Sequence, residues 1–183
     1  MILPIYVIGH PILRKKAAPI DMNYPELQTL LSDMFETMYQ DQGVGLAAPQ
    51  IGKSIRIFVI DSSPFKEMYP DVEIFNGVFI NPVMVEEFGD DFVFSEVCLS
   101  LPDIHEEVTR KSEIRISFTD ENGVEKTEHF KGLVARIIQH EYDHLEGRVF
   151  TDKLTSLKKM ILKRKLTDIA NGKSNANYKT KNK

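Results

Sequence analysis

The sequence predicts a single α+β domain in which antiparallel and mixed strands surround a central helix, with a further helix near the C-terminus. Three observations lead to this prediction. Apolar residues recur at helical spacing in separate segments, β-branched and aromatic segments lie between them, and an Asn-Gly pair joins two of those segments as a hairpin turn would. The chain of 183 residues, 42% of them hydrophobic, is long enough to bury one core.

The first expected helix covers residues 25–40. Its apolar side chains lie three and four residues apart, and Asn23 precedes it as a candidate N-cap. The segment GVGLAAPQ (43–50) follows, and its glycines and proline predict a loop whose backbone is closely approached by other groups. Residues 55–61, with the sequence IRIFVID, then predict a strand.

Further strands are expected in the middle of the chain. Residues 78–88 predict a strand in which Pro82 indicates an edge position or a bulge. The segments EIRISFTD and EKTEHF flank a turn that contains Asn122 and Gly123, which is typical of a β-hairpin. These elements account for the predicted sheet.

The central helix is expected to follow Gly132 and to end at Gly147, a residue typical of the position after a helix C-terminus. A last, basic helix is expected from about residue 155 to 170. We therefore expect one domain over residues 1–170. The polar residues 171–183 show no periodicity and predict a disordered basic tail.

Charge is distributed unevenly along the chain. From Lys153 onward there are ten Lys and Arg residues and a single acidic residue, Asp168, although the whole chain has a net charge of -4. A basic segment on an acidic body indicates an anionic partner, of which RNA is the commonest. A solvated tail without any partner would have the same composition.

The compartment is indicated by two further features. The N-terminal segment MILPIYVIGHPILRKK has no basic n-region, no small-residue cleavage site and far fewer apolar residues than the roughly 20 that a membrane span needs. A single cysteine, Cys98, cannot form an internal disulfide, which favours a reducing compartment. We therefore expect a cytoplasmic protein with neither a membrane nor a DNA partner.

The segment QHEYDHLEG (139–147) places two histidines, His140 and His144, on the expected central helix. At about 100° per residue their imidazoles point in directions only about 40° apart, and they lie about 6 Å apart along the axis, so one metal ion can bridge them. Glu141 flanks the pair within reach of a water molecule at the metal. Two such histidines can also be satisfied by hydrogen bonds alone, so the prediction depends on a third ligand.

That third ligand must come from another segment. Residues 148–183 contain neither His nor Glu, which closes the downstream position that the familiar zinc proteases use. Upstream, Cys98 lies at the end of a strand region and would complete a Cys, His, His set with a fourth position open to water. A lone cysteine is otherwise commonly a small buried apolar side chain.

Three segments, GVGLAAPQ, EVCLS (96–100) and QHEYDHLEG, resemble the three signature motifs of the peptide deformylases, in the same order and with similar spacing. The resemblance extends over nearly all of residues 1–155. It implies an enzyme that hydrolyses the formyl group from the N-terminal formylmethionine of new bacterial or organellar proteins and releases formate.

The resemblance also implies the catalytic centre. By position, Cys98, His140 and His144 match the family's metal ligands, and Glu141 matches its catalytic carboxylate. A metal ion at these ligands would make water nucleophilic near neutral pH. The carboxylate would take a proton from that water and pass it to the leaving amine nitrogen.

Other matching residues concern the substrate carbonyl and its surroundings. The side-chain amide of Gln50 and the backbone N–H of Leu99 match the family's oxyanion hole, and Gly45 matches a glycine whose backbone meets the substrate. We further expect Glu96 to pair with a cation and so fix the segment that carries the cysteine. Arg110 is our candidate for that cation.

The methionine side chain of the substrate suits an apolar pocket formed by Val44, Leu133 and Ile137, the last two of which share the histidines' face of the helix. The second motif departs from the family pattern, because Val97 stands where the family usually has glycine. A valine there would be strained if the backbone required a positive φ, and harmless in an extended strand. Its effect on substrate preference therefore depends on the local backbone.

A Cys, His, His set accepts iron(II), zinc, nickel or cobalt. The resemblance implies one divalent ion, with Fe2+ as the cellular metal and Zn2+, Ni2+ or Co2+ as replacements. It also suggests a partner for the basic C-terminal segment, because the family's substrates, N-formylmethionyl nascent peptides, emerge at the ribosome.

Three alternatives stay open from the residues alone. A zinc endopeptidase would share the His-Glu-x-x-His chemistry but would need a third ligand other than Cys98. A non-catalytic metal-stabilised binding protein would keep the ligands and have no use for Glu141. A catalytically degenerate relative of the deformylases is suggested by Val97.

Overall fold

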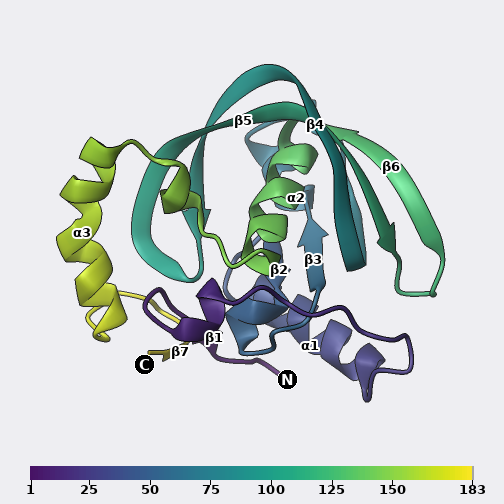
Figure 1. The fold of residues 1–183 in the computed structure, drawn as a ribbon, viewed down its shortest axis with the longest axis horizontal. Coiled ribbons are helices and arrows are strands. Elements are labelled where there is room, and N and C mark those ends of the chain that lie inside the picture. The colour runs from purple at the N-terminus through teal and green to yellow at the C-terminus, as the bar shows by residue number, and fades with distance from the viewer. Residues whose placement is uncertain (183) are drawn as a thin grey trace.

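An antiparallel sheet curves around the central helix α2 in a computed structural model that describes residues 1–182 (Figure 1). The helices are α1 (Leu27–Gln40), α2 (Gly132–Leu145) and α3 (Ser156–Ala170). The sheet has the strand order β2 (Gly45–Ala47), β3 (Ile57–Asp61), β4 (Asn76–Cys98), β5 (Leu101–Thr119) and β6 (Glu125–Lys131). A separate parallel pair joins β1 (Ile5–Tyr6) to β7 (Thr180–Lys181). The predicted α+β class is confirmed.

Helix α2 is buried along most of its length, and its buried residues include both apolar and polar side chains. Ile138 and Leu145 pack against Phe58 and Phe79 of the sheet in one core cluster. The helix ends at Leu145, and Gly147 follows two residues later with a φ of 70°, the left-handed conformation that glycine tolerates best. A Cβ at this glycine would lie 2.6 Å from the carbonyl oxygen of Arg14, so glycine also permits the close approach of the N-terminal segment.

Strands β4 and β5 form a long hairpin that arches over α2 (Figure 1). The strand predicted over 78–88 is therefore only part of β4, which extends to Cys98. The register shifts between Ile80 and Val83, which confirms a bulge at Pro82. At the other end, Leu99 and Ser100 make the turn into β5, so the cysteine is placed at a strand end beside the helix.

The N-terminus of α1 differs from the prediction. The helix begins at Leu27 after Glu26, which adopts a left-handed φ of 56° and makes no side-chain cap. Asn23 is not the N-cap, because its backbone N–H donates to the Asp21 carboxylate at 2.6 Å and lies in a separate turn. The hairpin turn at 122–123 and α3, with Thr155 as its N-cap, follow the predictions closely.

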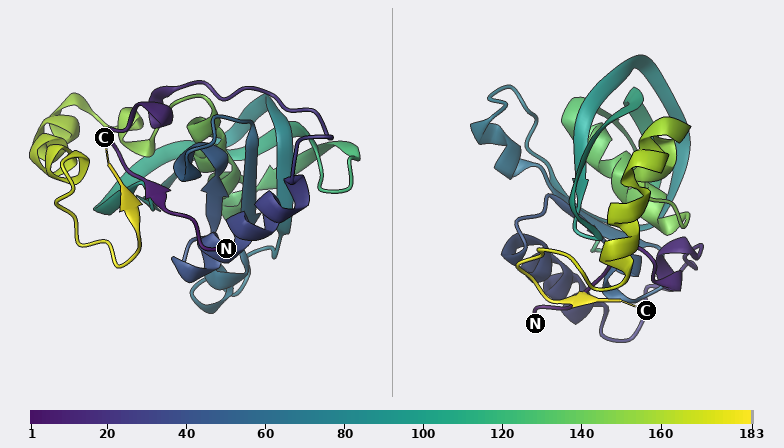
Figure 2. Two further views of the ribbon diagram at one scale, coloured as in Figure 1. Left: turned by 90° about the horizontal axis from the view of Figure 1, so that it is seen from below. Right: turned by 90° about the vertical axis from the view of Figure 1, so that its left-hand side faces the viewer.

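The C-terminal residues also correct an expectation. Residues 171–182, predicted to be disordered, leave α3 and return along the N-terminal segment, where β7 pairs with β1 (Figure 2). Backbone pairing holds them: Ile5 N–H donates to the Lys179 carbonyl at 2.9 Å and Val7 N–H to the Lys181 carbonyl at 3.0 Å. Within residues 1–182 no helix is both long and apolar enough to cross a membrane.

Candidate active site and metal centre

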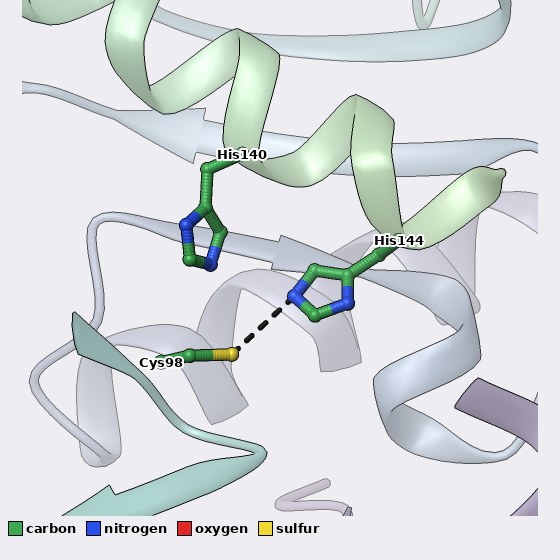
Figure 3. Close-up of side chains that lie close together, drawn as sticks. All are labelled: Cys98, His140 and His144. Atoms are coloured by element: carbon green, nitrogen blue, oxygen red, sulfur yellow. Dashed lines mark hydrogen bonds between the residues drawn. The ribbon is translucent and has the colours of Figure 1, made fainter. Parts of the chain in front are cut away.

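Three soft donor groups meet beside α2 (Figure 3). His140 and His144 project from successive turns of the helix, and Cys98 faces them from the end of β4. One ligand atom from each residue lies within 4.8 Å of the others, and Cys98 Sγ is 3.3 Å from His144 Nε2. All three side chains are buried. The structure therefore brings together the ligand set expected from the sequence.

The electrostatics of this cluster fit one metal ion. Burial lowers the pKa of His140, but hydrogen bonds with Cys98 and Glu96 outweigh it and raise the pKa well above its usual value. The surroundings of this ring therefore favour a positive charge, which a bound metal ion would supply in place of the proton. Burial, together with the charge of His140, lowers the pKa of His144 well below its usual value and keeps that ring neutral. A neutral imidazole and a thiolate are the forms that bind metals.

Glu96 organises the ligands from behind. Its carboxylate accepts from Arg110 at 2.6 and 3.0 Å and from Arg136 at 2.8 Å, and it lies 2.8 Å from His140 Nδ1. Burial would raise the pKa of Glu96, but the hydrogen bonds from His140 and Arg110 hold it well below its usual value. The carboxylate therefore fixes the His140 ring with Nε2 free for a metal. The predicted pairing of Glu96 with Arg110 is confirmed.

Two members of this ionic cluster were not predicted. Arg136 bonds Glu96 and the carbonyls of Phe92 and Val108, while Asp143 accepts from Arg110 at 2.7 Å. A signal for both was present, because they lie four residues before and three residues after His140 and so share its side of the helix.

Glu141 lies beside the ligands with one free oxygen. The side chain is buried, and burial raises its pKa to about 7. Within the described chain its Oε2 has no hydrogen-bond partner, which is costly for a buried carboxylate oxygen unless a further group uses it. The other oxygen lies against Gly45, where an added Cβ would be 2.5 Å from Oε1. Glycine is thus needed at this position for space.

Gln50 points its amide at the same centre. Ala47 N–H donates to Gln50 Oε1 at 2.8 Å, which orients the amide so that Nε2 faces Ser100 Oγ at 3.2 Å and Cys98 Sγ at 3.5 Å. Leu99 lies between these last two residues in the turn after β4. A donor amide, a strand-end backbone and a poised carboxylate therefore surround the ligand cluster.

Comparison with known proteins agrees with this arrangement. The family model for polypeptide deformylase matches residues 2–160. The chain is 50% identical to a peptide deformylase of Christiangramia forsetii over 189 aligned positions, which cover 98% of this chain and 95% of the relative. The chain belongs to the peptide deformylase family. It is therefore a metal-dependent hydrolase, and deformylation of nascent peptides is the known function of its family. This membership excludes the zinc endopeptidase and the non-catalytic binding protein as alternatives.

Solved deformylases share its fold. A crystal structure of a peptide deformylase from Legionella pneumophila matches with a TM-score of 0.81 and 38% identity, covering 93% of this chain and 96% of that one. A class I type b peptide deformylase from Acinetobacter baumannii, described as bound to Met-Ala-Ser, matches with a TM-score of 0.79 and 34% identity, covering 84% and 99%.

The candidate site opens into a cleft of about 850 Å³. Val44, Gly45, Val97 and Ile137 line this cleft together with Cys98 and His140 of the candidate ligand set, and with Glu141, Gln50 and Leu99. Leu133 does not line it, although the helical angle predicted that it would. It is half-buried in the first turn of α2, one turn before Ile137, and the first helix residue that lines the cleft is Arg136.

The backbone at Val97 does not require a positive φ, the conformation in which a valine would be strained. Non-glycine residues with positive φ are Glu26, Gln42, Asn81 and Asp103 within the described chain, and Val97 is not among them. The valine lies in β4 at a shift of register between Glu96 and Cys98, but its φ is not in the left-handed region, so a β-branched residue is unstrained there. Its side chain is 57% exposed at the mouth of the cleft.

Proposed function

We propose that this protein deformylates N-formylmethionyl peptides with Glu141 as the acid–base group and with Cys98, His140 and His144 as the ligands of one metal ion. The free Oε2 of buried Glu141 beside the ligand cluster is the observation that carries the proposal. With a pKa near 7, this carboxyl can both accept and return a proton near neutral pH.

The reaction breaks the C–N bond of the formamide and yields formate and a free amine. When bound, the metal supplies Lewis acidity, which makes water a nucleophile near neutral pH and polarises the carbonyl. Glu141 takes a proton from the attacking water and delivers it to the leaving nitrogen. The Gln50 amide and the Leu99 N–H donate hydrogen bonds to the oxyanion that develops on the formyl oxygen.

The cleft suits a peptide that begins with methionine. Val44 and Ile137 present apolar surface beside Glu141, and a flexible thioether side chain fills such a surface well. The Acinetobacter relative is described with Met-Ala-Ser bound, which is the product expected from a formylated peptide of that sequence. We therefore propose the same binding mode here.

The proposed metal is Fe2+, with Zn2+, Ni2+ or Co2+ as replacements. One thiolate and two imidazoles accept each of these ions. All three side chains are buried, and the Glu96 carboxylate behind His140 orients that ring. Metal analysis of protein purified without oxygen tests this assignment. Zinc as the sole bound metal with full activity would contradict it.

Direct assay tests the proposed reaction. Protein loaded with iron(II) under nitrogen should release formate from formyl-Met-Ala-Ser, and Glu141→Gln should lower kcat by about 10²–10⁴-fold while retaining the metal. Equal formate release by the wild type and the variant would overturn the role of Glu141. Formate release by neither protein, with one metal bound per chain, would overturn the reaction itself.

We further propose a cytoplasmic protein that contacts the ribosome through α3. Lys159, Lys163 and Arg164 are exposed on this helix beside the exposed apolar residues Met160 and Ile161. A basic helix of this kind favours RNA, and its binding should weaken steeply as salt rises.

Charge reversal tests the contact better than truncation, because it keeps the folded C-terminal residues in place. The triple variant Lys159→Glu, Lys163→Glu, Arg164→Glu should lose cosedimentation with ribosomes at low salt, with unchanged formate release from free peptides. Reversal of the exposed residues Lys15 and Lys53, remote in sequence from α3, is the control. Equal cosedimentation of both variants would contradict the proposal.

A further inference from the structure

The C-terminal residues form a strap, residues 171–182, that returns from α3 to the N-terminal segment (Figure 2). Besides the β7–β1 pairing, Asn175 N–H donates to the Asp103 carboxylate at 3.1 Å. The Asn182 amide donates to the Ile169 carbonyl at the end of α3 at 2.8 Å. The strap is therefore tied to three separate elements of the domain, namely β1, β5 and α3.

One residue of the strap reaches the active-site cleft. Tyr178 is half-buried, lines the cleft, and donates its hydroxyl hydrogen to the Leu99 carbonyl at 2.7 Å. Both residues pack against the core cluster beneath α1. Burial, with a contribution from Cys98, raises the pKa of Tyr178 well above its usual value, so the phenol stays a neutral donor at physiological pH.

The turn that accepts this bond is the one on which the site depends. Leu99 follows the ligand Cys98, and its N–H is a proposed oxyanion donor. On the other side Gln50 holds Ser100 Oγ at 3.2 Å. Within residues 1–182 no other hydrogen bond to the Leu99 carbonyl is present, so without the tyrosine rotation about the Leu99 backbone would be freer and would change the direction of the N–H. Donor direction matters because hydrogen bonds weaken steeply with misalignment.

We propose that Tyr178 is a positioning residue, which holds the Leu99 backbone in the orientation that donates to the reacting carbonyl, and that the strap completes the active site by placing it. This proposal rests on the proposed function, because it needs Leu99 N–H as an oxyanion donor. The hydroxyl acts in the catalytic step through Leu99. The ring forms part of the cleft wall and contributes to substrate binding.

The test separates these two parts of the side chain. In the iron-loaded full chain, Tyr178→Phe removes the hydroxyl and keeps the ring. We expect kcat for formyl-Met-Ala-Ser to fall about two- to tenfold, the range of one hydrogen bond. KM, metal content and melting temperature should stay near the wild-type values. Tyr178→Ala should lower kcat similarly and raise KM as well.

Tyr6→Phe is the matched control, because it removes a tyrosine hydroxyl from β1 beside the strap. In the described residues no hydrogen bond joins the Tyr6 hydroxyl to Leu99, so kcat should not change. A double-mutant cycle adds a readout that a merely structural role would not move. If Gln50 and Tyr178 hold the same turn, Tyr178→Phe should cost less in a Gln50→Ala background than in the wild type.

The outcomes are distinct. An unchanged kcat in Tyr178→Phe, in an active wild-type background, would overturn the positioning role. So would a loss of activity that only follows a lower melting temperature. Absence of formate release by the wild type would instead overturn the proposed function, before the tyrosine is tested.

Discussion

The two walls of the cleft are built in different ways. The inner wall, formed by α2 and the end of β4, carries buried side chains around an ionic cluster, in which Glu96 contacts two arginines and a histidine. The outer wall, formed by the segment Ser63–Glu67 with the residues after it and by the strap, carries Phe65, Tyr69 and Tyr178. These side chains are half-buried or exposed, and they are held by aromatic contacts and one hydrogen bond.

The difference indicates that the inner wall serves the chemical step and the outer wall serves substrate binding. Metal ligands and a proton-transfer group need fixed geometry, which a buried ionic cluster provides. A wall that meets many different nascent peptides gains from weaker, adaptable contacts. We therefore expect inner-wall substitutions to change stability, metal content and kcat. Outer-wall substitutions should change mainly KM, except at Tyr178, whose hydroxyl is bonded to Leu99 in the turn beside the ligand cluster.

Removal of Glu96 should have the largest effect. Glu96→Ala leaves Arg110 and Arg136 buried without their carboxylate, so we expect a loss of about 3–5 kcal/mol in the free energy of unfolding. Metal affinity should also fall about 10–100-fold, because His140 loses its orienting partner. Urea denaturation and metal titration measure the two effects.

Glu107→Ala is the control for this prediction, because Glu107 is exposed on β5 opposite Ser95 of β4. A loss below about 1 kcal/mol in Glu96→Ala, the range of surface ion pairs, would contradict the view that this buried ionic cluster holds the inner wall together.

Gln50→Ala should have the next largest effect, and among the kinetic constants it should lower kcat most. Loss of one oxyanion donor should lower kcat about 10²–10³-fold. Metal content should not change, because the amide is not a ligand. Steady-state kinetics with formyl-Met-Ala-Ser, together with metal analysis, provide the measurement. A rise in KM at constant kcat would show that Gln50 belongs functionally to the outer wall.

Much of the inner wall could be predicted from the sequence. Cys98, His140 and His144 were identified because helical geometry and three ordered motifs restrict them, and the pair Glu96–Arg110 was found through charge. These signals are local or tied to a motif. The bonds of Arg136 and Asp143 were not predicted, although the positions of these residues on the helix indicated them.

The outer wall could not be predicted in the same way. Residues 171–182 are polar and aperiodic, and their order comes from backbone bonds to β1, a partner more than 160 residues away in sequence. No local propensity reports such pairing. Leu133 illustrates the converse error, because a helical angle gives the direction of a side chain but not how far along the helix the cleft extends.

Phe65→Ala tests whether an outer-wall side chain affects substrate binding alone. Phe65 lines the cleft and contacts Phe94, with ring centroids 6.1 Å apart. Loss of this aromatic surface should raise KM for formyl-Met-Ala-Ser about two- to tenfold, with kcat and metal content unchanged. Lys66→Ala, in the same short segment but with an exposed side chain, is the control. A fall in kcat without a change in KM would break the division between the walls.

Val97 lies on the boundary between the walls, because its backbone belongs to β4 while its side chain is exposed at the cleft mouth. Since its φ is not in the left-handed region, glycine relieves no strain there. Val97→Gly should therefore lower the free energy of unfolding by about 0.5–1 kcal/mol, through greater freedom of the unfolded chain, and leave kcat/KM within about threefold. Denaturation and kinetics on a series of formyl-Met tripeptides measure both quantities. A gain in kcat/KM of tenfold or more, restricted to peptides with bulky second residues, would show instead that the valine narrows the cleft and selects substrates.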